Sequence, residues 1–129
     1  MSQCLGCRSS EASSMNDRFA KTPEPPYYAV IFTAQRSEDD TGYAKMANNM
    51  FELATKQPGC LGAESTRDEH GVGITVSYWK DEESILAWKQ QAQHLVAQQH
   101  GMERWYSHYE LRVAKVERAY SGPAGRSLG

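Results

Sequence analysis

Apolar residues follow the spacing of strands and helices along most of the chain between residues 27 and 120. The run YYAVIFTAQR, residues 27–36, starts with five apolar or aromatic residues and predicts a strand with both faces covered. Strands are also predicted over 60–68 and 72–80, where the turn residues EHG indicate a hairpin between them. A final strand of alternating character is predicted over 107–120.

Two segments place apolar residues three or four positions apart and predict helices. The first covers 43–57 and ends at the sequence QPG. The second begins after Asp81, a predicted N-cap, and continues to about Gln98 with Trp88 on its apolar stripe. Residues 98–106 are expected to form a short helical connection. The predicted fold is therefore α+β and ferredoxin-like, β-α-β-β-α-β, with both helices on one face of a four-stranded antiparallel sheet.

Alternation along the strands predicts one uniformly apolar face and a second face that mixes apolar and polar residues. The positions expected to be apolar are Tyr28, Val30 and Phe32, then Val72, Ile74, Val76 and Tyr78, and finally Tyr109, Leu111 and Val113. The mixed face carries too much aromatic and aliphatic surface to be left in water. We therefore expect a second copy to cover it, which would give a homodimer with a dimeric α+β barrel.

The two ends of the chain lack this patterning. Residues 1–26 are rich in Ser, Pro and charge and are expected to be a flexible N-terminal tail, and residues 121–129 a C-terminal tail, around a domain of residues 27–120. Cys4 and Cys7 form a CxxC, whose spacing is that of half a zinc site or of a redox pair, but in a predicted tail we expect it to have no function in the folded domain. No further ligands follow at a suitable distance, so we expect no metal.

The overall charge gives no reason to expect binding to nucleic acid or to an anionic membrane, because the formal net charge is -2. No apolar run approaches the roughly 20 residues of a membrane-spanning helix, and the N-terminus lacks the pattern of a signal peptide. We expect a soluble, cytoplasmic protein. Motifs of the GxGxxG, P-loop, HExxH and GxSxG types are absent.

Between Tyr28 and Tyr120 the sequence resembles the antibiotic biosynthesis monooxygenase family, within the dimeric α+β barrel superfamily. The turn QPGCLG and the strand-to-helix junction YWKDEESILAWK carry most of the resemblance. It implies catalysis without metal, flavin or haem, in which the anion of an electron-rich phenol or hydroquinone reduces O₂ and then recombines with it.

The function implied by this resemblance is a cofactor-independent monooxygenase that acts with O₂ on a small phenol, quinol or polyketide-like aromatic. One alternative is a non-enzymatic small-molecule-binding or stress-associated protein on the same scaffold. A further alternative is haem binding or degradation. Haem-degrading relatives place a His ten residues after the helical Trp, where this chain has Gln98, between His94 and His100. Glutamine is a poor axial ligand for iron, which argues against haem.

Three residues are candidates for catalysis. Trp88 either shapes a pocket against the sheet, as in related enzymes, or is a large core residue. Gln35, where haem-degrading relatives carry Asn, either binds a substrate oxygen or O₂, or is an ordinary strand-end residue. His94 is a general base with an intrinsic pKa near ~6.5, or a solvated surface residue. The residues expected to contact the substrate are Phe32, Met50, Trp79, Trp105, Tyr106 and Tyr109.

Overall fold

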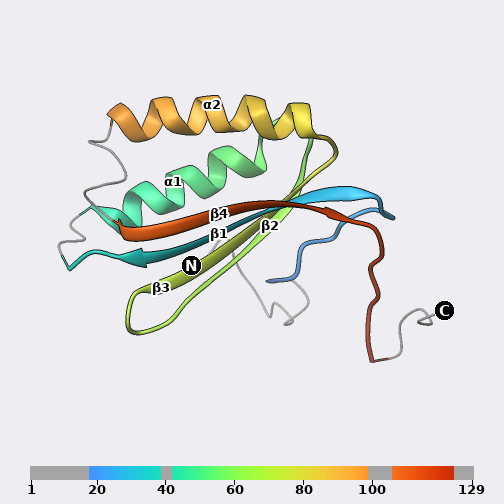
Figure 1. Cartoon of the computed structure of the whole chain (residues 1–129), viewed down its shortest axis with the longest axis horizontal. Coiled ribbons are helices and arrows are strands. Elements are labelled where there is room, and N and C mark those ends of the chain that lie inside the picture. Colours follow the sequence, from blue (N-terminus) through green and yellow to red (C-terminus); the bar gives the residue numbers. More distant parts are fainter. Residues whose placement is uncertain (1–17, 39–41, 99–105, 124–129) are drawn as a thin grey trace.

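The structure is a computed structural model and describes residues 18–38, 42–98 and 106–123; the side chains of residues 94–98 are not described. Its elements, in chain order, are β1 (Tyr27–Arg36), α1 (Tyr43–Thr55), β2 (Cys60–Arg67), β3 (Val72–Trp79), α2 (Glu82–Gln98) and β4 (Tyr106–Val116). The predicted β-α-β-β-α-β order and α+β fold are confirmed (Figure 1). The predicted helical connection over 98–106 lies almost entirely outside the described residues.

Both helices begin where local chemistry favours a helix start. Gly42 precedes α1 with a left-handed φ of 82°, a conformation that glycine adopts without steric cost. Asp81 caps α2 as predicted, because its Oδ1 accepts a hydrogen bond of 2.8 Å from the backbone N–H of Ser84. Hydrogen bonds from the Ser84 side chain and backbone lower the pKa of Asp81, so the cap is fully ionised at neutral pH.

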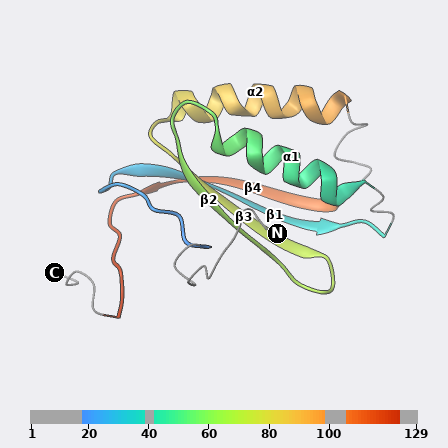
Figure 2. The ribbon, with the colours of Figure 1, turned by 180° about the vertical axis from the view of Figure 1, so that it is seen from behind.

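The four strands form one antiparallel sheet in the order β2-β3-β1-β4. Both helices lie on the same side of this sheet, as the two opposite views in Figures 1 and 2 show. Helix α1 contacts β2, and α2 contacts β3. The strand β4 is therefore an edge strand that neither helix covers closely. Neither helix therefore covers the second face of the sheet, and on the first face neither covers β4 closely.

The registers divide the apolar positions between the two faces differently from the prediction. Phe32 pairs with Thr75 and with Leu111, whereas Ile31 pairs with Val76. Paired residues point to the same side of a sheet. The apolar residues of β3 therefore lie on the helix-free face, opposite Phe32. The prediction of one uniformly apolar face is wrong, because alternation fixes which residues of one strand share a face but not how strands are matched.

The described part of the predicted N-terminal tail, residues 18–26, lies against the helix-free face. The backbone N–H of Ala20 donates a 2.8 Å hydrogen bond to Glu64, whose other carboxylate oxygen accepts one of 2.8 Å from the Tyr78 hydroxyl. Burial, and then the bond to Glu64, raise the pKa of Tyr78. A Cβ at Gly62 would lie 3.1 Å from the Cβ of Ala20, so glycine allows this close approach.

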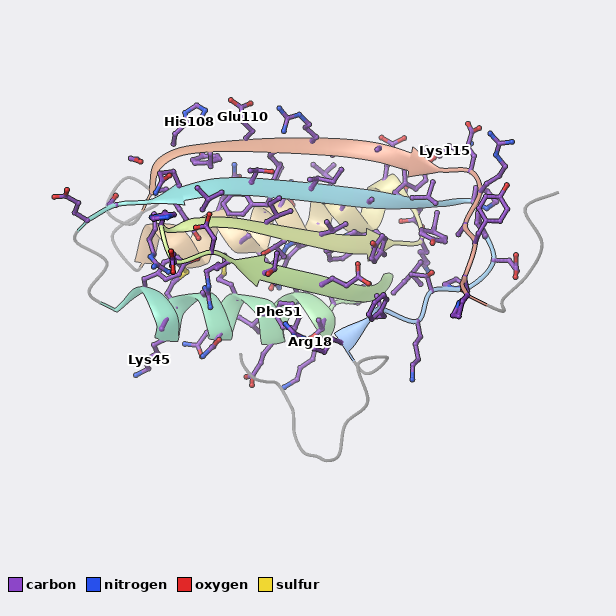
Figure 3. All side chains as sticks on the ribbon, turned by 90° about the horizontal axis from the view of Figure 1, so that it is seen from below. Arg18, Lys45, Phe51, His108, Glu110 and Lys115 are labelled. Carbon is purple, nitrogen blue, oxygen red and sulfur yellow. The ribbon has the colours of Figure 1, made fainter. Side chains whose placement is uncertain are left out.

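Beyond this segment, the described residues leave part of the helix-free face exposed. Val72 and Ile74 of β3 are both exposed there, Ile74 to 41%. At the edge of the sheet, His108 and Glu110 lie next to each other on β4 (Figure 3), with 2.8 Å between His108 Nε2 and Glu110 Oε2. The helix-free face thus combines exposed aliphatic side chains with a charged edge.

Candidate functional site

Two tryptophans stack between α2 and the sheet. Trp79 ends β3 on the helix-bearing face, and Trp88 lies on the inward stripe of α2; their ring centroids are 6.5 Å apart at an interplanar angle of 20°. Trp79 has 0% of its surface exposed, and its Nε1–H donates a 2.8 Å hydrogen bond to the Ser77 hydroxyl. Trp88 is only half-buried. Of the two, Trp79 has the surroundings of a core residue, and Trp88 is the one a ligand can reach.

A second aromatic group lies on the same face, nearer the end of β1. Phe32 contacts Tyr106 and Tyr109, with ring centroids 5.4 and 5.6 Å away, and these two tyrosines contact each other at 6.2 Å. Tyr106 also meets Tyr43 of α1 edge-on at 5.6 Å. Met50, which we predicted to contact substrate, packs against the core pair of Tyr43 and Met46 together with Tyr106. Four of the predicted substrate contacts are therefore brought together around Tyr43.

A row of exposed apolar side chains extends along β4 from the second aromatic group. Tyr109, Leu111 and Val113 alternate along β4 on its helix-bearing face, each with between 45% and 50% of its surface exposed. We call these three residues the β4 strip. Tyr109 belongs to the Phe32 group. At the other end of the strip, Val113 is paired with Val30 on β1, and Val30 is paired with Ser77 on β3, which accepts the hydrogen bond of Trp79. Exposed apolar rows of this size commonly mark binding surfaces.

The distance between the two groups follows from the registers. Phe32 pairs with Thr75, four residues before Trp79 on β3. At about 3.3 Å per residue, the two groups lie roughly 13 Å apart along the strands. A fused-ring aromatic molecule that lay on the β4 strip would meet the Phe32 group at Tyr109, whereas Trp79 lies two strands away on β3.

Burial and hydrogen bonding set the chemistry of the tyrosines in the second group. Burial, followed by the neighbouring Tyr43 and a hydrogen bond with it, raises the pKa of Tyr106, so this phenol stays protonated at any physiological pH. Two arginines meet the Tyr43 ring: the Cζ atoms of Arg36 and Arg67 are 5.2 and 5.3 Å from its centroid. Sequence reasoning missed both, because they come from the ends of different strands.

The predicted catalytic residues are not all near this surface. Gln35 pairs with Val72 and His108 and so lies on the helix-free face, where its Nε2 donates hydrogen bonds to the carbonyls of His70, at 3.0 Å, and Arg36, at 3.3 Å. His94 belongs to α2, but its side chain lies outside the described residues, as does all of Trp105. Of the three, the described geometry places only Trp88 beside the sheet on its helix-bearing face.

The described residues hold neither a metal-ion site nor a membrane-spanning helix. Among them, no group of three or more His, Cys, Asp or Glu residues is arranged to hold a metal ion. Cys4 and Cys7 lie outside them. No helix in the described ranges is long and apolar enough to cross a membrane.

Residues 26–100 match the family model described as antibiotic biosynthesis monooxygenase. The chain belongs to the antibiotic biosynthesis monooxygenase family. A Bacillus subtilis (strain 168) member named "Uncharacterized protein YqjZ" is 52% identical over 104 residues, which cover 81% of this chain and 91% of that protein. "Jasmonate monooxygenase ABM" from Pyricularia oryzae is 37% identical over 95 residues, or 69% of this chain, and the match spans 43% of that longer protein.

Two solved structures share the fold. SnoaB from Streptomyces nogalater, described as a cofactor-independent oxygenase, superposes with a TM-score of 0.61 at 8% identity, over 74% of this chain and 97% of SnoaB. PA3566 from Pseudomonas aeruginosa does so with a TM-score of 0.58 at 14% identity, over 75% and 98% of the two chains. At these identities the likeness concerns the fold alone.

Proposed function

We propose that this member of the antibiotic biosynthesis monooxygenase family is a cofactor-independent monooxygenase that oxidises a small phenol, quinol or polyketide-like aromatic with O₂. The observation that carries the proposal is the β4 strip, an exposed apolar row on the helix-bearing face, which begins in the aromatic group of Phe32, Tyr106 and Tyr109. A flat aromatic molecule binds such a row through apolar contact and ring stacking. The family includes monooxygenases by its description, which is consistent with this chemistry.

In the proposed reaction, the substrate loses its phenolic proton to a base, for which His94 on α2 remains our candidate. The phenolate transfers one electron to O₂, and the resulting radical and superoxide combine at a ring carbon. The peroxide then loses water, which takes the hydrogen of that carbon and leaves a quinone carbonyl. For a naphthol, one O₂ is consumed and one quinone and one water are formed. The protein binds the ring, favours the phenolate and limits access of water.

Oxygen uptake tests this proposal. The metal-free protein would be mixed with a panel of hydroquinones and naphthols in an oxygen electrode, with heat-denatured protein as the control for spontaneous oxidation. We expect protein-dependent uptake with at least one compound. The absence of protein-dependent uptake across the panel, with binding of the same compounds retained, would contradict catalysis and favour a non-enzymatic binding protein on this scaffold.

We also propose that the working form is a homodimer joined through the helix-free face. Val72 and Ile74 are exposed on this face, and water contact with such aliphatic side chains is unfavourable. Sedimentation analysis at micromolar concentration should give a dimer for the wild type. It should give a monomer for Ile74→Lys, whereas Leu86→Lys, on α2 with 56% of Leu86 exposed, should leave the dimer intact. A wild-type monomer would contradict this assembly.

A further inference from the structure

Arg67, at the end of β2, lies across the sheet rather than pointing away from it. It pairs with Gly73 on β3, and a Cβ at Gly73 would lie 2.8 Å from Arg67 Cγ and 3.6 Å from its Cδ. The aliphatic part of Arg67 therefore occupies the space that a side chain at position 73 would need. Gly73 in turn pairs with Ala34 on β1, which is also small. This pair of small residues allows Arg67 to lie flat on the helix-bearing face.

The guanidinium of Arg67 ends against the tyrosines of the second aromatic group. Its Nη1 donates a 3.2 Å hydrogen bond to the Tyr43 hydroxyl, and its Cζ lies 5.3 Å from the centre of that ring. Arg36 approaches the same ring at 5.2 Å. Both cations are close enough to Tyr106 to act on its hydroxyl electrostatically, each lowering its pKa against the larger effect of burial. Two positive charges thus converge on one end of the β4 strip.

Arg67 makes no ion pair with any carboxylate among the residues that the structure describes. Arg67 is exposed, so a ligand can reach its charge. A guanidinium held by ring contact and one hydrogen bond keeps further N–H donors available, in the planar geometry that matches a carboxylate. Because the ring contact and the hydrogen bond already hold the Arg67 side chain, binding a ligand costs little further side-chain entropy.

We propose that Arg67 binds the carboxylate of an aromatic acid whose ring lies on the β4 strip. The substrate class is thereby narrowed from phenols in general to phenols or quinols that carry an acid group. This inference rests on the proposed function, because the same surface is taken to hold the ring. Tyr109 and Phe32 stack with the ring, and Arg67 fixes its orientation by holding the charged end.

Anaerobic equilibrium dialysis separates this inference from catalysis, since no turnover is needed. The probes are 2-naphthoate, which is anionic at neutral pH, and 2-naphthol, which is neutral. We expect the wild type to bind 2-naphthoate more tightly than 2-naphthol, and added NaCl to weaken only the naphthoate complex. Arg67→Gln should raise the dissociation constant of 2-naphthoate by about tenfold or more, as expected for loss of a charged hydrogen bond, and change that of 2-naphthol less than about twofold.

Two further variants control for charge and position. Arg112→Gln removes the same charge from the exposed edge strand β4 and should leave both dissociation constants unchanged. Gly73→Ala keeps the charge but displaces the stem of Arg67, and should weaken 2-naphthoate binding while sparing 2-naphthol. Far-ultraviolet circular dichroism checks that each variant is folded.

Three results would overturn the inference: no preference of the wild type for 2-naphthoate, equal effects of Arg67→Gln and Arg112→Gln, or equal loss of both probes in folded Arg67→Gln. Tight naphthoate binding without oxygen uptake on any phenol, acidic or neutral, would instead contradict the proposed catalysis and leave the acid site standing. Oxygen uptake with neutral naphthols alone, and no naphthoate binding, would retain catalysis and remove the acid site. The two proposals therefore fail in distinguishable ways.

Discussion

Trp88→Phe should mainly lower activity, whereas Trp79→Phe should mainly lower stability. The two rings stack on each other, but Trp79 is fully buried and its Nε1–H donates to Ser77, whereas Trp88 is half-buried. Phenylalanine keeps an aromatic ring at either position and so avoids the largest cavities. Trp88→Phe changes the surface that a ligand meets, and Trp79→Phe changes the core beneath it.

The magnitudes follow from these contacts. Trp88→Phe weakens one stacked contact, which contributes about 0.5–1.5 kcal/mol, and so should lower the free energy of unfolding by about 1 kcal/mol. Trp79→Phe weakens the same contact, leaves a gap where the larger indole was, and removes the donor to the buried Ser77 hydroxyl. An unsatisfied buried polar group alone costs about 1–3 kcal/mol, so a total near 3 kcal/mol is expected. Thermal midpoints should fall by about 6 °C and about 18 °C respectively.

The assay combines urea denaturation with oxygen uptake on the best substrate of the panel. We expect Trp88→Phe to remain folded and lose most of its turnover, and Trp79→Phe to be the less stable protein but to retain more activity per folded molecule. Unchanged turnover in folded Trp88→Phe would reassign Trp88 to the core. A smaller loss of stability in Trp79→Phe than in Trp88→Phe would refute the burial argument itself.

Two further predictions concern the fold. In urea denaturation, Gly59→Ala should destabilise the protein more than Gly42→Ala. Both glycines have left-handed φ values, 88° and 82°, and this conformation costs a residue with a side chain about 1–2 kcal/mol. Only at position 59 would the added Cβ also clash, because it would lie 2.6 Å from the Cβ of Ser84. Equal losses would contradict the predicted clash. In an alkaline titration followed by tyrosinate absorbance, Tyr78 and Tyr106 should stay protonated when exposed tyrosines ionise near pH ~10, because burial raises both pKa values. Below pH ~10 the free energy of unfolding is unaffected by ionisation of these two tyrosines, and above it the protein becomes less stable, because the same tyrosines ionise in the unfolded chain while they stay protonated in the folded one. Ionisation of every tyrosine in the folded protein near pH ~10 would disagree with their burial.

The elements could be predicted from sequence because their signals are local. The apolar run at the start of β1, the spacing in α1 and the Asp81 cap of α2 each depend on residues within a few positions of one another. The contact of Phe32 with Tyr106 and Tyr109 could also be predicted, since large aromatic residues on adjacent strands of a known topology tend to meet.

The long-range features could not be predicted in this way. Which residues of β3 share a face with Phe32 depends on the register between strands, and a shift by one residue reverses it. The path of Arg67 over Gly73 depends on the same register, and nothing near Arg67 in the sequence indicates it. Residues 18–26 contact the sheet through a backbone N–H and a small side chain, at Ala20, and neither leaves a pattern in the sequence.

In the proposed reaction, the chain itself, without a cofactor, inserts one atom of O₂ into an aromatic ring. Incubation of metal-free protein with ¹⁸O₂ and a naphthol or hydroxynaphthoate, followed by mass spectrometry of the quinone, tests it most directly. We predict one ¹⁸O atom in each quinone, formed at a rate proportional to protein concentration and strongly reduced in Trp88→Phe. Quinone without ¹⁸O, or formed equally fast without folded protein, would contradict the account.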